Sequence, residues 1–148
     1  MIANEMEFVH DTASVRLRAA GHRYTSQRRR LVELLSRAGN PISIPEILKS
    51  RRGLAQSSVY RNLADLEQAG VVRRVMTEEE FGRYELTEDL TGHHHHLICS
   101  SCGKVEDVTV SDDLEGTLDR SLDRLARRAG FAQVSHRLDL IGLCSDCA

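Results

Sequence analysis

The chain has 148 residues, which allows one large domain or two small ones, and its hydrophobic content of 41% supports a real core. An aromatic content of 4% argues against an aromatic-rich binding platform. The first residues show neither the basic nor the apolar segment of a signal peptide, and no apolar run approaches a membrane span. We therefore expect a cytoplasmic protein whose thiols stay reduced and available for metal.

The net charge of −2 hides an asymmetry between the two halves of the chain. Residues 1–84 carry 14 Lys and Arg against 10 Asp and Glu, whereas residues 85–148 carry 6 against 12. Residues 13–32 hold six arginines and no acidic residue. A charge run is usually a solvated surface, but a basic half joined to an acidic, Cys- and His-rich half suggests a polyanion binder coupled to a cation binder.

Caps and hydrophobic periodicity predict three helices before residue 51. The first is short, roughly residues 13–20. The second starts after Thr25 as its N-cap and stops at Gly39, where a helix needs a residue that tolerates positive φ. Ser43 and Glu46 then form a capping box that opens a short third helix.

The fourth predicted helix runs from about residue 57 to residue 70 and is followed by two alternating segments, 71–76 and 83–86, which indicate a β-hairpin wing. Its buried stripe should consist of Val59, Leu63 and Leu66. Its outward side chains should be Ser57, Ser58, Arg61 and Asp65. Helices followed by a wing, with hydroxyls and an arginine at the N-terminal end of the last helix, fit a helix that enters the major groove of DNA. Any small helical domain with an exposed fourth helix is the alternative.

Two Cys-x-x-Cys pairs are the most specific motif of the second half. The pairs are Cys99 with Cys102 and Cys144 with Cys147. Two thiolate pairs at this spacing complete a closed tetrahedral zinc site, and Gly103 suits the turn after the first pair. The alternative is a disulfide framework, which the absence of a secretion signal disfavours.

Four consecutive histidines, His93 to His96, stand directly before the first cysteine pair. Residues 93–98 are predicted to be a strand, so that His94 and His96 point to one face and His93 and His95 to the other. The run can therefore serve two separate metal sites. A solvated histidine loop is the alternative.

The rest of the second half predicts a strand over residues 105–110, a helix over residues 111–129 and a final strand over residues 131–144. The helix has an apolar stripe of Leu114, Leu118, Leu122 and Leu125. Glu115 lies at the edge of that stripe, as a first-turn charge or as an inward-turned ligand. His136 shares a strand face with Leu138 and Leu140, where it is either a core histidine or a metal ligand.

Three segments together resemble the ferric uptake regulator family, over roughly residues 16–147. They are the helix Ser57-Ser58-Val59-Tyr60-Arg61-Asn62-Leu63, the run from His93 through Cys102-Gly103-Lys104, and the terminal Cys144-Ser145-Asp146-Cys147. The resemblance implies an α+β fold: a winged helix-turn-helix DNA-binding domain (1–84), a hinge (85–92) and a small α/β dimerisation domain with a four-cysteine zinc site (93–148). It also implies a homodimer that represses metal-homeostasis genes when a regulatory metal closes the two domains onto a palindromic operator.

The resemblance assigns residues to four roles. DNA contacts fall to Arg23, Tyr60 and Arg61, and structural zinc to Cys99, Cys102, Cys144 and Cys147. A regulatory site at the hinge takes Glu85, His94 and His96. An additional site takes His93, His95, Glu115 and His136, with Asp112 as the competitor of Glu115.

Two departures from the family pattern leave the fourth regulatory ligand open. The loop at residues 40–43 lacks the histidine that many members supply, and residues 87–90 hold acids where the zinc-sensing branch often has a cysteine. Asp89, His22 and His10 are the candidates. Fe²⁺, Mn²⁺ and Zn²⁺ all suit a Glu/His site, and the missing thiolate favours iron, with zinc as the alternative. An open catalytic zinc site or a metal buffer would leave the winged helix unexplained, so we do not expect an enzyme.

Overall fold

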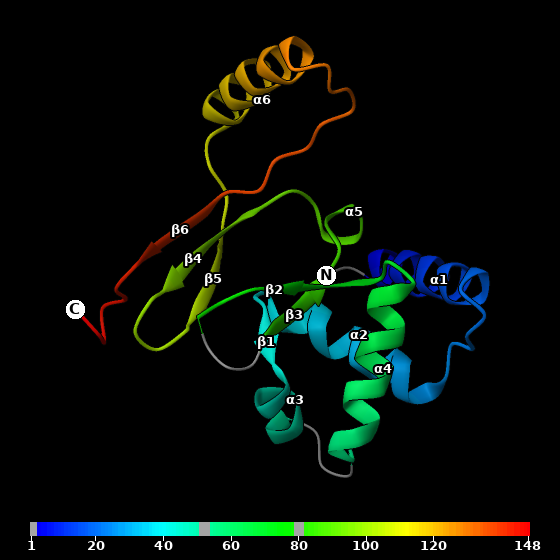
Figure 1. The fold of residues 1–148 in the computed structure, drawn as a ribbon. Coiled ribbons are helices and arrows are strands. Elements are labelled where there is room, and N and C mark those ends of the chain that lie inside the picture. The colour runs from blue at the N-terminus through cyan, green and yellow to red at the C-terminus, as the bar shows by residue number, and fades with distance from the viewer. Residues whose placement is uncertain (1–2, 51–53, 79–81) are drawn as a thin grey trace.

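The computed structural model describes residues 3–50, 54–78 and 82–148. In chain order the elements are α1 (Ala3–Ala19), α2 (Ser26–Ala38), β1 (Ile42–Ser43), α3 (Ile44–Ser50), α4 (Gln56–Gln68), β2 (Val72–Val75), β3 (Arg83–Leu86), α5 (Glu88–Thr91), β4 (His95–Cys99), β5 (Val105–Val108), α6 (Asp112–Arg128) and β6 (Asp139–Gly142) (Figure 1). Two three-stranded sheets form, in the orders β1-β3-β2 and β5-β4-β6. None of the helices in these ranges has the length and apolar character that a membrane crossing needs.

Helices α1 to α4 surround one apolar core, and most of the predicted caps and faces are confirmed. The Thr25 hydroxyl accepts from the Arg28 N–H at 3.3 Å, and Gly39 ends α2 with a φ of 68°. The predicted stripe of α4 is fully buried. The first helix is longer than predicted, because Val9 lies one turn before Ala13 and extends the buried face of α1 toward the N-terminus.

The predicted capping box at α3 is present and is tied to the β1-β3-β2 sheet, called the wing sheet below because it holds both strands of the predicted wing. The Glu46 carboxylate accepts from the Ser43 N–H at 2.7 Å and from the Ser43 hydroxyl at 2.8 Å. The Arg83 guanidinium of β3 donates to the same carboxylate at 2.8 Å. Partial burial would raise the pKa of Glu46, but the Ser43 hydrogen bonds and Arg83 lower it below its ordinary value.

Replacing Glu46 by glutamine is expected to lower the free energy of unfolding by about 1 kcal/mol at neutral pH, because a charge-assisted cap is lost. The pKa of Glu46 is depressed in the folded state, so this difference exists above the ordinary pKa of 4.5 and vanishes as pH falls through the folded value. Urea unfolding at pH 7 and at about pH 3 measures both quantities. Glu67→Gln, on the exposed face of α4, is the matched control, and an equal loss in that variant would contradict the prediction.

The wing sheet places a cation opposite an anion. Strands β2 and β3 are antiparallel, with Arg73 directly across from Glu85, and β1 pairs with the other edge of β3. Part of the predicted acidic connection, residues 79–81, lies outside the described residues. Strand β3 runs on to Leu86, which pairs with Val72, so the connection between the sheets begins at Thr87 and not at residue 85 as expected. It contains the short helix α5, which the sequence did not predict.

The second sheet is assembled around β4. Strand β5 pairs with β4 antiparallel and β6 pairs with it parallel. All three predicted strands are shorter than expected, because pairing starts only at His95 in β4, ends at Val108 in β5 and is confined to residues 139–142 in β6. His93 and His94 therefore precede the strand, and His136 lies in the irregular segment before β6.

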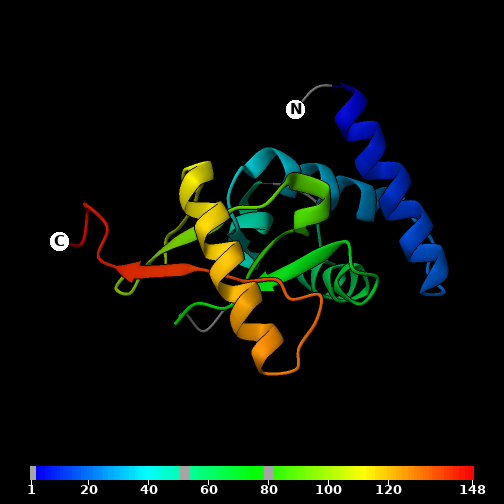
Figure 2. The same ribbon diagram turned by 90° about the horizontal axis from the view of Figure 1, so that it is seen from above.

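Burial is divided unevenly between the first part of the chain, before His93, and the second part, from His93 onward. The apolar core cluster runs from Val9 to Leu90 and belongs entirely to the first part. Helix α6 buries none of its residues, and in Figure 1 it projects from the second sheet on two irregular connections; Figure 2 shows the same helix from above. Its predicted apolar stripe exists but is exposed or half-buried, and β6 is exposed along its whole length.

Candidate metal centres and DNA-binding surface

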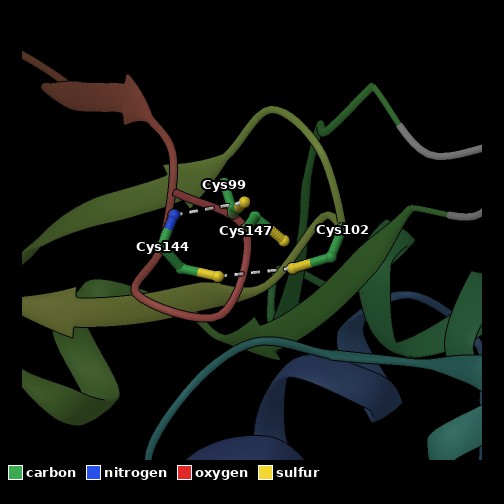
Figure 3. Close-up of side chains that lie close together, drawn as sticks. All are labelled: Cys99, Cys102, Cys144 and Cys147. Atoms are coloured by element: carbon green, nitrogen blue, oxygen red, sulfur yellow. Dashed lines mark hydrogen bonds between the residues drawn. The ribbon is translucent and has the colours of Figure 1, made fainter.

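Four thiols converge where the turn after β4 meets the C-terminal turn. The turn closes with the Gly103 N–H on the Cys99 carbonyl at 3.0 Å and with Gly103 at a φ of 71°. Cys144 and Cys147 approach from the other side. The four Sγ atoms all lie within 4.8 Å of one another (Figure 3). The Cys102 and Cys144 sulfurs are 3.8 Å apart.

The sulfur geometry fits a zinc ion and excludes a disulfide between Cys102 and Cys144. A tetrahedral ion with bonds of about 2.3 Å holds sulfurs about 3.8 Å apart, whereas a disulfide brings them to about 2.05 Å. All four cysteines are free. Backbone N–H groups of Cys102, Cys144 and Ser101 point at the Cys99 sulfur and lower its pKa to about 6. Cys99 is thus prepared to be a thiolate, the form that binds metal.

A second cluster joins the two sheets, and it is named after the predicted hinge. Glu85 comes from β3, His94 directly precedes β4, His96 lies in β4, and Asp107 comes from β5; their nearest donor atoms lie within 4.8 Å of one another. The Glu85 Oε2 lies 3.0 Å from His94 Nε2 and 3.3 Å from His96 Nε2. This group, called the hinge cluster below, is the only one of the three that contains a residue of the wing sheet.

The electrostatics of the hinge cluster favour a cation. Burial would raise the pKa of Glu85, but hydrogen bonds to His96 and His94 and the Arg73 guanidinium lower it to about 2. Burial raises the pKa of Asp107, and the charge of Glu85 adds to this rise against the attraction of His94 and His96. The buried Glu85 carboxylate, the exposed Asp107 carboxylate and two imidazoles form a donor set for a hard or borderline divalent ion.

A third cluster lies between the histidine run and α6. It combines His93, His95, Glu115 and His136, again with donor atoms within 4.8 Å. The two Glu115 oxygens meet His93 Nε2 at 3.0 Å, His95 Nε2 at 2.9 Å and His136 Nε2 at 2.9 Å. Among the described residues, three buried side-chain atoms here make no well-aligned hydrogen bond, namely His95 Nδ1 and the closely spaced Glu115 Oε1 and His136 Nε2. Buried polar atoms of this kind at a His₃Glu cluster fit a metal-binding site.

Most of these histidines are oriented by a second contact, which leaves Nε2 facing its cluster. The Nδ1 atoms contact Glu88 (His93, 3.1 Å), the Gly92 carbonyl (His94, 2.9 Å), Asp139 (His96, 3.1 Å) and Asp119 (His136, 3.3 Å). Carboxylates and carbonyls of this kind set the tautomer and ring orientation of metal-ligating histidines. His95 is the exception, because its Nδ1 is buried and has no hydrogen-bond partner among the residues that the structure describes.

None of the three expected candidates for the fourth hinge residue joins the hinge cluster. Asp89 forms an ion pair with Arg16, His22 contacts Gln68, and His10 contacts Tyr24 and Glu33. Asp107 takes that place, and sequence reasoning missed it. The sequence held a signal for it. Strands β4 and β5 are antiparallel and joined by a short turn, so pairing Ile98 with Val105 next to the turn places His96 opposite Asp107 two residues further on.

Glu115 rather than Asp112 lies in the third cluster. Asp112 is exposed in the first turn of α6, one residue after the Ser111 cap, whereas Glu115, three residues later in the same turn, points toward His95. The alternation predicted for the histidines holds in space even though His93 and His94 precede β4. His94 and His96 face Glu85, and His93 and His95 face Glu115.

The side chains expected to contact DNA lie on one helix and the turn before α2. Ser57, Tyr60 and Arg61 are exposed on α4, Ser58 is half-buried, and Arg23 is exposed.

The orientation of α4 is set by Arg28 of α2. Its Nε donates to Asn62 Oδ1 at 3.1 Å, its Nη1 donates to the Arg23 carbonyl at 2.5 Å, and its guanidinium forms an ion pair with Asp65. Asp65 is half-buried in this contact and not outward-facing as predicted.

The family model for the "Ferric uptake regulator family" matches residues 19–141. The chain belongs to the ferric uptake regulator family. The ferric uptake regulation protein of Legionella pneumophila is 30% identical over 139 residues, which cover 90% of this chain and 97% of the relative. The peroxide operon regulator of Bacillus subtilis is 28% identical and aligns over 100% and 97% of the two chains. The structure of the Helicobacter pylori ferric uptake regulator, described as having three functional metal-binding sites, superposes with a TM-score of 0.75 at 26% identity, over 96% of this chain and 93% of that one.

Membership in the ferric uptake regulator family makes this chain a metal-responsive transcriptional regulator. Its three clusters account for every cysteine and for five of the seven histidines. His10 and His22 remain, and their partners Tyr24 and Gln68 lie before the histidine run of this family member.

Proposed function

We propose that the protein is a cytoplasmic, homodimeric repressor that binds a palindromic operator when the hinge cluster holds a divalent ion, with Fe²⁺ as the leading candidate. The four-cysteine cluster would hold a structural Zn²⁺. The observation that carries the proposal is the composition of the hinge cluster: Glu85 belongs to the sheet of the DNA-binding part, His96 and Asp107 belong to the other sheet, and His94 directly precedes that sheet. An ion bound by all four ties the two parts together.

A hinge ion can switch DNA binding only if it binds one arrangement of the two parts better than others. Glu85, at the end of β3, and His94, just before β4, are separated by the connection that contains α5. Any rotation of that connection separates the carboxylate from the imidazoles and lowers the affinity for the ion. Metal binding therefore favours the arrangement in which Glu85 and the histidines are together, and we propose that this arrangement holds two recognition helices at operator spacing.

The donor set leaves three candidates for the sensed metal. Two imidazoles and two carboxylates suit Fe²⁺, Mn²⁺ and Zn²⁺. The hinge cluster contains no thiolate, and this favours iron over zinc. A zinc uptake regulator of the same family is the alternative, supported by the higher affinity of zinc for nitrogen and oxygen ligands.

The homodimer is supported by the apolar surface of the second part. Its exposed side chains include Leu97, Leu114, Leu125, Phe131, Leu140, Ile141 and Leu143. A groove of about 300 Å³ along β4 and β6 is lined by several of these residues. Helix α6 and β6 bury almost nothing within one chain, so a second copy would complete the core that this part lacks.

Arg61→Ala is expected to weaken operator binding and to reduce the slope of log affinity against log salt by about one per protomer, because a phosphate-bound cation releases a counterion. Duplexes selected from a randomised pool by the Fe²⁺-loaded protein supply the operator, and mobility shifts over a salt series give the slope. If Arg61 reads a base instead, specificity relaxes at one position while the slope holds. Arg37→Ala, at the far end of α2, is the matched control, and identical behaviour of the two variants would remove Arg61 from the interface.

A further inference from the structure

Two charged side chains that belong to neither histidine cluster lie between them. Arg73 of β2 donates from Nε to Glu85 Oε1 at 2.6 Å, and its Nη1 lies 3.2 Å from Glu88 Oε1. The other oxygen of Glu88 lies 3.1 Å from His93 Nδ1. Glu85 belongs to the hinge cluster and His93 to the third cluster, so Arg73 and Glu88 form a continuous bridge between the two.

Secondary structure positions both residues of this bridge. The β2–β3 register sets Arg73 directly across from Glu85. Glu88 stands in the first turn of α5, inside the connection between the sheets, and His93 follows that helix. The Arg73 and Glu88 side chains are 14% and 28% exposed, so the contacts are shielded from water more than ordinary surface ion pairs.

The two cluster residues at the ends of the bridge use different atoms for the bridge and for their cluster. His93 uses Nδ1 for Glu88 and keeps Nε2 for Glu115. Glu85 uses Oε1 for Arg73, an atom that also lies 3.2 Å from His96 Nε2, and keeps Oε2 near His94 and His96. An ion can therefore bind at either cluster without breaking the bridge.

We propose that Arg73 and Glu88 are positioning residues that couple the two clusters, so that an ion in the third cluster tightens binding of an ion in the hinge cluster. This coupling rests on the proposed function, since it requires both clusters to bind metal. An ion on His93 Nε2 fixes the imidazole ring and makes its Nδ1–H a stronger donor to Glu88. Glu88 then holds Arg73, and Arg73 holds Glu85 with its free oxygen toward the histidines.

The sign of the coupling follows from conformational freedom. Ion binding at the hinge must immobilise Glu85 and the connection that carries Glu88. An ion in the third cluster has already immobilised Glu88 through His93. Binding of the hinge ion then loses less conformational entropy, and the hinge ion binds more tightly. Repulsion between the two divalent ions acts in the opposite direction, but Glu85, Glu88 and Glu115 lie at or between the clusters and screen it. The coupling is reciprocal, so the hinge ion also tightens the third cluster.

A double-mutant cycle on the full-length, zinc-loaded protein tests the coupling. Co²⁺ is titrated into wild type, His136→Ala, Glu88→Gln and the double variant, and paramagnetically shifted imidazole resonances assign each binding event to its cluster. His136→Ala disables the third cluster. We expect it to weaken Co²⁺ binding at the hinge cluster about five- to tenfold in the wild-type background. In the Glu88→Gln background we expect no further loss, because an NH₂ group replaces one of the two carboxylate oxygens and cannot accept from Arg73 or from His93 in its place.

Arg73→Gln breaks the bridge at its other member and should abolish the coupling in the same way. Asp89→Asn removes a carboxylate from the same helix, but one that pairs with Arg16, and should leave the coupling intact. Two sites that fill independently or anticooperatively in wild type, or a coupling that survives Glu88→Gln, would overturn the coupling alone. If no Co²⁺-shifted imidazole resonances appear in wild type, the proposed function is overturned together with it.

Discussion

Cys102→Ser is expected to unfold the second part of the chain and to leave the protein monomeric. Apart from Ile98, Cys99 and Val105, the large buried apolar residues lie before residue 91, so the second part has little core of its own to resist the loss of its zinc. Binding of a structural zinc contributes on the order of 10 kcal/mol of folding free energy in small zinc domains, which exceeds the stability that such a sheet can supply. Zinc content by mass spectrometry and oligomeric state by sedimentation velocity measure the outcome.

Ser145→Ala is the matched control, because Ser145 lies in the same C-terminal turn and is exposed. It should keep its zinc and remain a dimer. Cys147→Ser should behave as Cys102→Ser does, since both remove one of four thiolates from one ion. A stable, metal-responsive dimer from Cys102→Ser would show that the four-cysteine cluster is not structural.

Alanine substitutions along the histidine run are expected to divide into alternating pairs. His94→Ala and His96→Ala should each abolish metal-activated operator binding, with a loss in metal affinity of at least about 100-fold, because each removes a ligand from the hinge cluster. His93→Ala and His95→Ala should chiefly lower the thermal stability of the second part, because they open the third cluster. Operator affinity at fixed metal concentration and thermal unfolding of all four variants supply the comparison.

The Arg73–Glu88 bridge predicts a smaller, additional effect of His93→Ala on metal binding at the hinge cluster. His93→Ala also removes the link from the third cluster to Glu88, so it should weaken hinge binding modestly, by the coupling factor and not by 100-fold. Grouping of sequence neighbours, with His93 like His94 and His95 like His96, would contradict the two-cluster assignment. The alternation does not depend on β4 itself, since His93 and His94 precede the strand and still point to opposite clusters.

Local signals in the sequence predicted local structure well. The Thr25 cap, the Ser43 capping box and the stripe of α4 are all set by contacts within a few residues, and each is confirmed. The extension of α1 was missed because its only buried apolar residue before Ala13 is Val9, flanked by the polar His10 and without a capping signal.

Properties that depend on pairing between distant segments were predicted less well. The parallel pairing of β6 with β4 joins residues more than forty positions apart, and it shortened a strand that alternation alone extended to residue 131. Asp107 reaches the hinge cluster only through the β4–β5 register. Asp65 was expected to face outward because helical spacing alone does not reveal Arg28 on the neighbouring helix.

Metal-dependent operator binding by the full-length, zinc-loaded protein tests the central claim most directly. Fluorescence anisotropy on the selected duplex would be measured without added metal and with Fe²⁺ under anaerobic conditions, Mn²⁺ or Zn²⁺, in wild type and in Glu85→Gln. We predict that at least one of these ions raises operator affinity about tenfold or more in wild type and has no effect in Glu85→Gln, because the glutamine removes the ligand that the DNA-binding part contributes. Equal operator affinity with and without every ion, or equal activation of both proteins, would contradict a metal switch at the hinge.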